Sequence, residues 1–428
     1  MPATSTFSGL FPPTRRVVIL DGGMGTTLQA PPFELALDSA LWSSELLADE
    51  AGCSQLDRLH RTWIDAGADI VETCTYQSSL PLFLPSSRAP TAAESSTALA
   101  TMTAALPVAC ASCANHPPAS STASSSRRAQ VALSLGPYGS ALQPGQEYTG
   151  AYPPPFGPAA SAAPDAQPAS SAEALAAVPL PLDAVRGAGV SDDEAHLAAW
   201  HLQRLVHFSE SSAAAGPDDD ARVGLVAFET VPSLAEVRAI RRAAHVFSVL
   251  HPDRPQPPFY ISLVFPRATP QGAAADVRFP DAALAHLESL DAQLAVLVDA
   301  VLAPADGLAQ PAGLGFNCTS PLAARGVVRA LGAAVAAARP TSLTSPAGLK
   351  PWLVLYPDGG AVYDVRSRTW SHPAGLTDAS WAALVADAVG DALACGEWEG
   401  VVAGGCCKAG PGAIRALRDE VERRGWRE

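Results

Sequence analysis

Three of the eight cysteines stand directly after short runs of small and apolar residues. Cys318 follows "GLGFN" (313–317), and Cys406 and Cys407 are neighbours after "GVVAGG" (400–405). A disulfide between adjacent cysteines strains the backbone, so we expect these two cysteines to act as separate thiols. Three thiolates that met at one point would form an acceptable zinc site, with a fourth position left open for a substrate.

Each of these cysteines, taken alone, could be a small residue of the core. Their shared position after an apolar run favours the metal site. Gly404 and Gly405 would allow the sharp turn that directs both neighbouring thiols inward. The segment "CASCANH" (110–116) also has a metal-like C-x-x-C spacing, but no second ligand pair accompanies it and it adjoins a Ser/Pro-rich stretch, so we do not predict a metal there.

Eight short segments that are rich in Val, Ile and Leu are predicted to be strands. Six of them end in Gly, Pro or Cys, and their apolar residues do not alternate with polar ones, as in parallel sheets that are covered on both faces. They are residues 16–23, 68–76, 130–139, 222–230, 259–266, 313–318, 352–360 and 400–407.

Helical spacing of apolar residues occurs between these strands. It predicts helices over residues 54–67, 192–211, 233–244, 280–300, 321–338, 378–389 and 413–424. The alternation favours an α/β fold, a single (β/α)8 TIM-type barrel, over an open doubly wound sheet. The first strand is followed by "DGGMGTTL", which does not match the dinucleotide-binding pattern G-x-G-x-x-G.

The active site of such a barrel lies at the carboxyl ends of its strands. The three cysteines are predicted to converge there. The other candidate residues at these ends are Asp21, Gly22, Gly23, Tyr76, Glu229 and Asn317.

The sequence predicts one barrel domain over residues 1–428. Four stretches rich in Ala, Ser, Pro and Gly interrupt the pattern and are expected to be flexible surface insertions, because they cannot bury enough apolar area to offset their ordering entropy. They lie at about residues 84–128, 153–190, 212–221 and 339–350.

Composition excludes several classes of partner. A formal net charge of −14 argues against nucleic acid, which requires clustered Lys and Arg. No apolar run is expected to span a membrane, and the first residues lack the pattern of a signal peptide. We therefore expect a cytoplasmic protein with reduced cysteines and small-molecule substrates. The sequence does not indicate its oligomeric state.

Several stretches resemble the homocysteine S-methyltransferases, specifically the cobalamin-independent group that uses S-methylmethionine as methyl donor. The matching segments are "ILDGGMGTTL", "AGADIVETCTYQSS", "SLGPYGSALQPGQEYTGAY", "FETVPSLAEVRAI", "GFNCTSP", "LVLYPDGGAVYD" and "GGCCKAGPGAIRAL". They cover most of the chain outside the low-complexity insertions, and the pairing of "GFNC" with "GGCC" is the most specific of them.

The resemblance implies that Cys318, Cys406 and Cys407 hold Zn2+. It also implies that Asp21 and Glu229 hold homocysteine through its amino group. Gly22, Gly23, Tyr76 and Asn317 belong to the same motifs and are expected to contribute to substrate binding. Lys408 and Ala409 replace the Arg-Thr or similar polar pair that many relatives have after the cysteines.

The expected reaction moves a methyl group from a sulfonium donor to the thiol of homocysteine and gives methionine. A sulfonium suits this role because it leaves as a neutral thioether and needs no general acid. S-Methylmethionine and S-adenosylmethionine both qualify as donors. Glycine betaine as donor, selenocysteine as acceptor, or a catalytically silent zinc-binding barrel remain alternatives.

Overall fold

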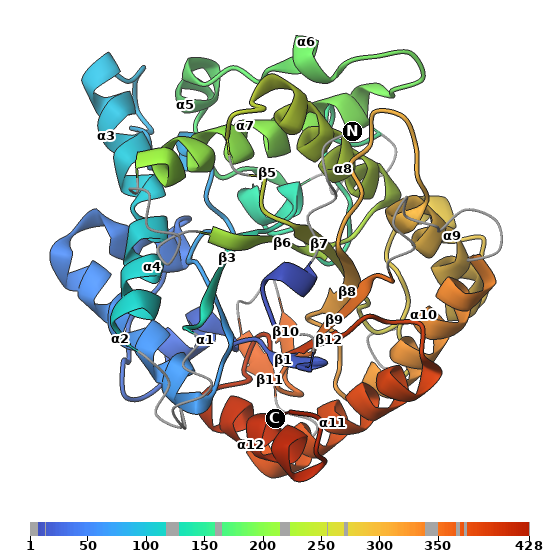
Figure 1. The fold of residues 1–428 in the computed structure, drawn as a ribbon. Coiled ribbons are helices and arrows are strands. Elements are labelled where there is room, and N and C mark those ends of the chain that lie inside the picture. The colour runs from blue at the N-terminus through green and yellow to red at the C-terminus, as the bar shows by residue number, and fades with distance from the viewer. Residues whose placement is uncertain are drawn as a thin grey trace.

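Eight parallel strands form a barrel at the centre of the molecule (Figure 1). The computed structural model describes residues 7–12, 14–116, 128–158, 165–214, 223–254, 256–268, 273–338, 350–364, 369–371 and 375–427. The strands are β1 (Val17–Ile19), β2 (Ile70–Glu72), β3 (Gln130–Leu135), β6 (Val223–Val231), β7 (Phe259–Val264), β8 (Gly313–Asn317), β9 (Trp352–Tyr356) and β12 (Val401–Ala403). Their order in the sheet is β1-β12-β9-β8-β7-β6-β3-β2, and all neighbours are parallel.

The barrel closes between β1 and β2. A parallel bridge pairs Leu20 with Ile70. The Asp69 N–H donates to the Ile19 carbonyl at 2.7 Å, and the Asp21 N–H donates to the Ile70 carbonyl at 3.1 Å. The predicted eight-stranded barrel is therefore confirmed, and the seam lies between the first two strands of the chain.

Asp69 fastens this seam at the amino ends of the strands. Its carboxylate accepts from the Ile19 N–H at 2.9 Å, from Arg15 at 3.0 Å and from Arg427 at 2.6 Å. Arg15 and Arg427 come from opposite ends of the described chain. The buried Asp69 carboxylate therefore links both ends to the seam between β1 and β2.

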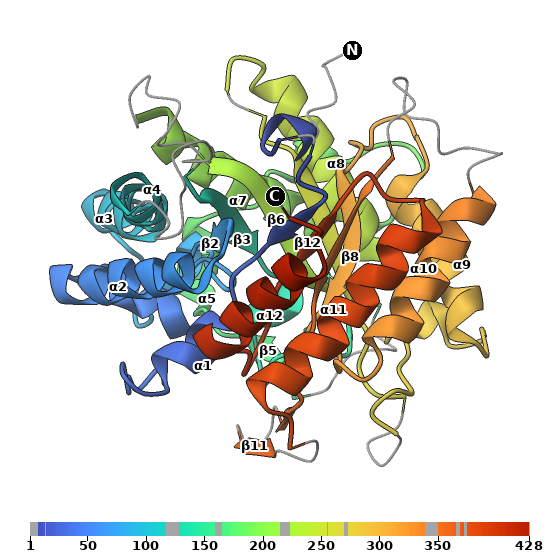
Figure 2. The same ribbon diagram turned by 60° about the horizontal axis from the view of Figure 1, so that its bottom comes forward.

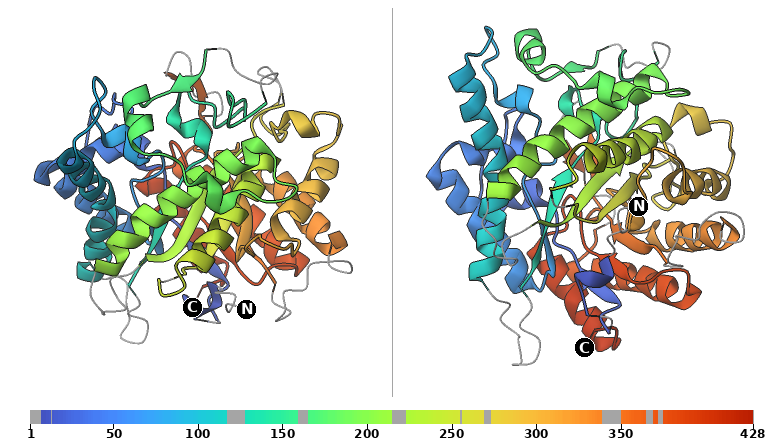
Figure 3. Two further views of the ribbon diagram at one scale, coloured as in Figure 1. Left: turned by 90° about the horizontal axis from the view of Figure 1, so that it is seen from above. Right: turned by 45° about the horizontal axis from the view of Figure 1, so that its top comes forward.

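Helices surround the barrel, as the two rotated views show (Figures 2 and 3). Apolar residues inside the strands and on the inner helix faces form one large core between the two layers, and a smaller cluster that includes Val18, Ile70 and Tyr260 fills the barrel interior. The main helices are α2 (Glu50–Ala66), α3 (Ala92–Thr103), α4 (Ala105–Asn115), α7 (Asp192–Ala214), α8 (Leu234–Leu250), α9 (Leu290–Leu302), α10 (Ala324–Ala338), α11 (Asp378–Cys395) and α12 (Pro411–Arg423).

Several shorter elements complete the fold. The segment η1 (Phe7–Gly9) packs into the interior cluster, where the Phe7 ring lies 6.2 Å from that of Tyr260 and 5.9 Å from that of Trp352. The other short elements are α1 (Met24–Leu28), η2 (Trp42–Ala48), η3 (Leu80–Phe83), η4 (Tyr138–Ala141), β4 (Leu142–Gln143), β5 (Gln167–Pro168), α5 (Ala172–Ala177), α6 (Leu182–Val185), η7 (Ala282–Leu284), β10 (Val362–Asp364) and β11 (Thr369–Ser371).

Residues 84–128 differ from the expected flexible insertion. Their described part contains α3 and α4, and α3 begins with a complete capping box between Thr91 and Glu94. The Ala/Ser composition hid these helices, although Ala is the best helix former. The stretch 92–115 is long and apolar enough to cross a membrane, yet half of its most apolar window is buried, and the helices pack on α2 and α7.

Two other predictions need adjustment. Residues 153–190 contain β5, α5 and α6 in their described part. The helix expected over 280–300 begins only after Ser289, whose side chain accepts from the Ala292 N–H at 3.1 Å and caps α9. The insertion at 339–350 lies outside the described residues except for its last residue. Of the insertion at 212–221, the first three residues belong to the end of α7 and the others lie outside the described residues.

Candidate active site

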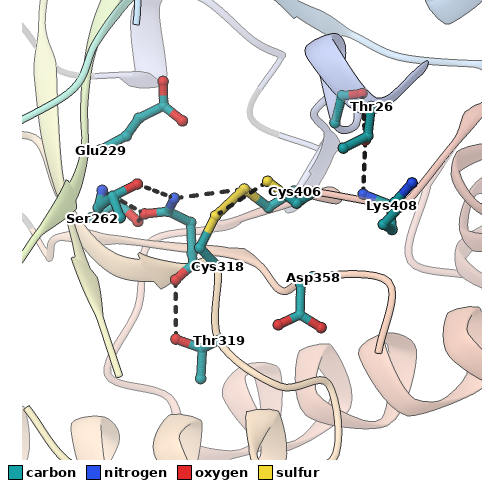
Figure 4. The surroundings of a disulfide bond; sticks show 12 residues. Thr26, Glu229, Ser262, Cys318, Thr319, Asp358, Cys406 and Lys408 are labelled. Carbon is teal, nitrogen blue, oxygen red and sulfur yellow. Dashed lines mark hydrogen bonds between the residues drawn. A yellow bond between two sulfur atoms is a disulfide. The ribbon is translucent and has the colours of Figure 1, made fainter. Parts of the chain in front are cut away.

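The three cysteines meet at the carboxyl-end mouth of the barrel. Cys318 follows β8, and Cys406 and Cys407 follow β12. Their sulfur atoms all lie within 4.8 Å of one another, and the Cys318 and Cys407 sulfurs are 3.9 Å apart. Cys318 and Cys406 form a disulfide across the two strand ends (Figure 4). The structure therefore brings together the three sulfurs that the sequence placed at strand ends.

The donor set suits zinc once the disulfide is reduced. Zinc–sulfur bonds of about 2.3 Å in a tetrahedral site place the sulfur atoms about 3.8 Å apart. The separation between Cys318 and Cys407 already has this value within 0.2 Å. Cys406 can act as third ligand only as a free thiolate, so metal binding and the Cys318–Cys406 bond exclude each other.

Two residues beside the cluster have left-handed backbone conformations. They are Cys318, with φ of 46°, and Lys408, with φ of 65°. Gly404 and Gly405 do not have positive φ. The prediction that they are needed for a sharp turn of the backbone was therefore wrong. They are needed for close packing, because a Cβ on Gly404 would lie 2.7 Å from Leu20 Cβ and one on Gly405 would collide with Ala409.

The loop after β1 packs directly against the cysteine turn. A Cβ on Gly23 would lie 2.6 Å from the Cys406 carbonyl oxygen and 2.9 Å from Cys407 Cα, and one on Gly22 would lie 2.7 Å from the Trp63 ring. The Thr26 hydroxyl accepts from the Lys408 N–H at 2.8 Å. Both glycines line the central cavity, so they allow substrate and the cysteine turn to share one narrow space.

Asn317 is fully buried next to the cysteine cluster and supports it through hydrogen bonds. Its Oδ1 accepts from the Thr230 N–H and from the Ser262 hydroxyl, both at 2.8 Å. Its Nδ2 donates to the Thr230 hydroxyl at 2.8 Å and to the Cys406 sulfur at 3.8 Å. These contacts make Asn317 a positioning residue for Cys406. Direct contact between Asn317 and substrate stays a prediction.

Three carboxylates lie together inside the barrel mouth. Asp21 accepts from the Glu72 N–H at 2.9 Å, and its Oδ1 is buried with no hydrogen-bond partner among the described residues. Glu229 accepts from the Ser134 hydroxyl, and Glu72 accepts from the Tyr260 hydroxyl at 3.1 Å. Glu72 was not among the predicted site residues, because the predicted strand extended to residue 76, whereas β2 ends at Glu72.

Burial and mutual repulsion make these carboxylates hard to charge. Burial raises the pKa of Glu229 to about 7. Burial is also the main cause that raises the pKa values of Asp21 and Glu72, and repulsion from Glu229 adds to it in both. A positively charged ligand would favour their charged forms, so the group is suited to an ammonium.

A cavity of about 570 Å³ connects Glu72 and Glu229 with the cysteines, whereas Asp21 is not among its lining residues. This volume is typical of small-molecule sites, which span about 300–1,000 Å³. None of the described residues that line it is Lys, Arg or His. Its lining includes Tyr76, as predicted, and four carboxylates: Asp38, Glu72, Glu147 and Glu229. Such a surface favours cationic ligands.

A buried arginine holds the loops that carry Tyr76. Arg204 of α7 donates to the carbonyls of Ser78 at 2.8 Å, Gly136 at 2.7 Å, Tyr76 at 2.9 Å and Thr75 at 3.2 Å. It therefore ties the ends of β2 and β3 to each other. The spacing of apolar residues predicts that Arg204 lies on a helix, but it does not predict which carbonyl groups the side chain binds.

We expect Arg204→Met to destabilise the protein by about 3–5 kcal/mol, because it leaves buried carbonyls without donors. Chemical denaturation measures the free energy of unfolding. Arg186→Met is the matched control, since Arg186 is an exposed arginine whose ion pair with Asp192 should contribute less than about 1 kcal/mol. Equal losses in both variants would contradict the role of Arg204.

Cys74 lines the cavity, but none of the other cysteines outside the cluster and no described histidine does. Cys110 and Cys113 are buried on α4, and burial raises the pKa values of their thiols to about 11 and about 12. His116 pairs with Asp65 at 2.8 Å. His60 and His201 are buried helix residues, and His201 lies 3.1 Å from Glu236.

The fold and the site together define a TIM-barrel enzyme with a sulfur cluster and an acidic pocket at its carboxyl-end mouth. The homocysteine S-methyltransferase family model matches residues 18–421, and the chain belongs to this family. It is therefore an enzyme that transfers a methyl group to homocysteine, as the resemblance implied.

Similar proteins come from plants and bacteria. Homocysteine S-methyltransferase 1 of Arabidopsis thaliana is 26% identical over 409 residues, which cover 95% of this chain and 94% of that protein. Homocysteine S-methyltransferase YbgG of Bacillus subtilis is 25% identical and covers 94% of both. The oxidized form of the homocysteine methyltransferase MmuM from Escherichia coli has the same fold, with a TM-score of 0.54, 20% identity and coverage of 96% and 99%.

Proposed function

We propose that this enzyme transfers a methyl group from S-methylmethionine to the thiol of L-homocysteine, with Zn2+ held by Cys318, Cys406 and Cys407. The observation that carries the proposal is the meeting of three sulfurs beside a cavity lined by carboxylates and by no described basic residue. The sulfurs supply a metal site, and the carboxylates suit substrates that carry positive charge.

Zinc would supply a charge that lowers the pKa of a thiol. A free thiol has a pKa of about 8.5, so little thiolate is present at neutral pH without such help. Three cysteine thiolates are a zinc donor set with one position left open. A metallated form of MmuM from Escherichia coli, which shares the fold with a TM-score of 0.53 and 20% identity, is consistent with a metal in this type of barrel.

The chain's own residues would bind and orient the amino acids. The carboxylates of Asp21 and Glu229 would accept hydrogen bonds from the ammonium group of homocysteine, and the nearby Glu72 would add negative charge. Asn317 fixes Cys406, and Gly22 and Gly23 leave space for the substrate beside the cysteine turn. These contacts would hold the homocysteine thiol near the cysteine cluster. We also propose a cytoplasmic location, where thiols remain reduced.

An assay with three donors tests the proposal. The purified protein is reduced, supplied with zinc and given homocysteine with S-methylmethionine, S-adenosylmethionine or glycine betaine, and methionine is quantified. We expect the highest kcat/KM with S-methylmethionine. Faster turnover with betaine, or no methionine from either sulfonium, would overturn it. Selenocysteine as acceptor in a parallel reaction tests the alternative acceptor.

A further inference from the structure

Glu147 is a carboxylate of the active-site cavity that the homocysteine-binding group does not use. It lies in the loop between β4 and β5 and lines the cavity together with Tyr76 and Tyr148. Its own backbone N–H satisfies part of the carboxylate. Its Oε2 is buried and has no hydrogen-bond partner among the described residues. A buried carboxylate oxygen in that state is costly unless a ligand supplies a donor.

The local backbone is arranged around this side chain. A Cβ at Gly145 would collide with Glu147 Oε2, so glycine leaves the space that the carboxylate occupies. The loop is folded back by the Gln146 N–H, which donates to the Gly139 carbonyl at 3.0 Å. The Gln146 side chain adds a bond to the Pro144 carbonyl, also at 3.0 Å. The position of Glu147 is therefore set by the protein before any ligand enters.

Glu147 and Glu229 both contribute to the raised pKa values of Tyr76 and Cys407, and each also acts on other groups. Repulsion from Glu229 adds to burial in raising the pKa values of Asp21 and Glu72, whereas repulsion from Glu147 adds to burial in raising the pKa of Tyr148. Tyr76 interacts with both Glu147 and Glu229, so it is close enough to be influenced by both carboxylates. Two amino-acid substrates must occupy this cavity together, and each carries an ammonium group.

We propose that Glu147 is the specificity residue for the methyl donor and accepts a hydrogen bond from the donor's α-ammonium group. A sulfonium centre has no N–H or O–H to donate, so the unpartnered Oε2 selects the ammonium and not the sulfonium. The rings of Tyr76 and Tyr148 beside it suit a sulfonium, because aromatic faces attract cations. This inference rests on the proposed function, since it assigns the donor side of the same site.

The test compares two sulfonium compounds. S-Methylmethionine carries the α-ammonium group, and dimethylsulfoniopropionate lacks it. Loss of a charge-assisted hydrogen bond corresponds to a factor of about 10–100 in binding. We therefore expect Glu147→Gln to raise KM for S-methylmethionine by about this factor and to leave KM for homocysteine unchanged. The inhibition constant of dimethylsulfoniopropionate against methionine formation should not change in the variant.

Glu173→Gln is the matched control, because Glu173 is an exposed carboxylate of α5 that does not line the cavity. It removes the same charge and should change the donor KM less than about twofold, as expected for a screened surface charge. An unchanged donor KM in Glu147→Gln, or an equal rise in both variants, would overturn the inference. Absence of turnover in the wild-type protein would instead refute the proposed function, so the two failures are distinguishable.

Discussion

Cys406→Ser is expected to lose bound zinc and nearly all methyl transfer while the fold is retained. Loss of a group that merely supports a metal ligand costs about 10–100-fold in affinity or activity. Loss of the ligand itself should therefore cost on the order of 1,000-fold in kcat/KM. Metal content by mass spectrometry and methionine formation measure the two effects, and far-ultraviolet circular dichroism measures the fold.

Cys395→Ser is the control for this variant. Cys395 is an exposed cysteine near the end of α11, and its thiol donates to the Ala392 carbonyl at 3.1 Å. The control should keep its zinc and its rate. Both proteins must be assayed with a reductant, because the Cys318–Cys406 disulfide withholds two of the three sulfurs. Full turnover by Cys406→Ser would refute the metal-centred site.

Glu229→Gln is expected to weaken homocysteine use by about 30- to 1,000-fold in kcat/KM, the range for loss of one partner of a buried charge pair. Glutamine keeps the shape and an oxygen for the Ser134 hydroxyl but cannot neutralise an ammonium group. The loss should fall mainly on KM for homocysteine. Steady-state kinetics with each substrate varied in turn measures this division.

Ser134→Ala is the companion to Glu229→Gln. It removes the hydroxyl that donates to Glu229 but keeps the negative charge, so its effect on the homocysteine KM should be about tenfold or less. Zinc content and the free energy of unfolding should stay near wild-type values in both variants. A homocysteine KM in Glu229→Gln equal to that of the wild type would show that this carboxylate does not hold the ammonium.

The barrel and its cysteine cluster were predictable because they depend on order along the chain. Apolar strands separated by helices define which ends face the mouth. Cys318 directly follows one such strand, and Cys406 follows another after two glycines. The acidic neighbours were only partly predictable. Glu229 stands near a strand end, but Glu72 reads as part of a strand, and whether its side chain faces the interior depends on the pleat and the register.

Other features depend on contacts that spacing does not encode. Arg204 shares its helical periodicity with ordinary surface residues, and only the packing of α7 over the ends of β2 and β3 shows its function. Glu147 follows a proline-containing loop whose path no periodic pattern specifies. The helices α3 and α4 were missed for a different reason, because alanine and serine repeats resemble low-complexity sequence even when they are helical.

The seam between β1 and β2 has a consequence for biosynthesis. β1 also pairs with β12, and Asp69 binds Arg427, which is 358 positions away. These contacts can form only after nearly the whole chain has left the ribosome. Until then β1 lacks its β12 neighbour, and an exposed strand edge invites pairing with other chains. Production of the enzyme should therefore depend on protection of its nascent amino-terminal half.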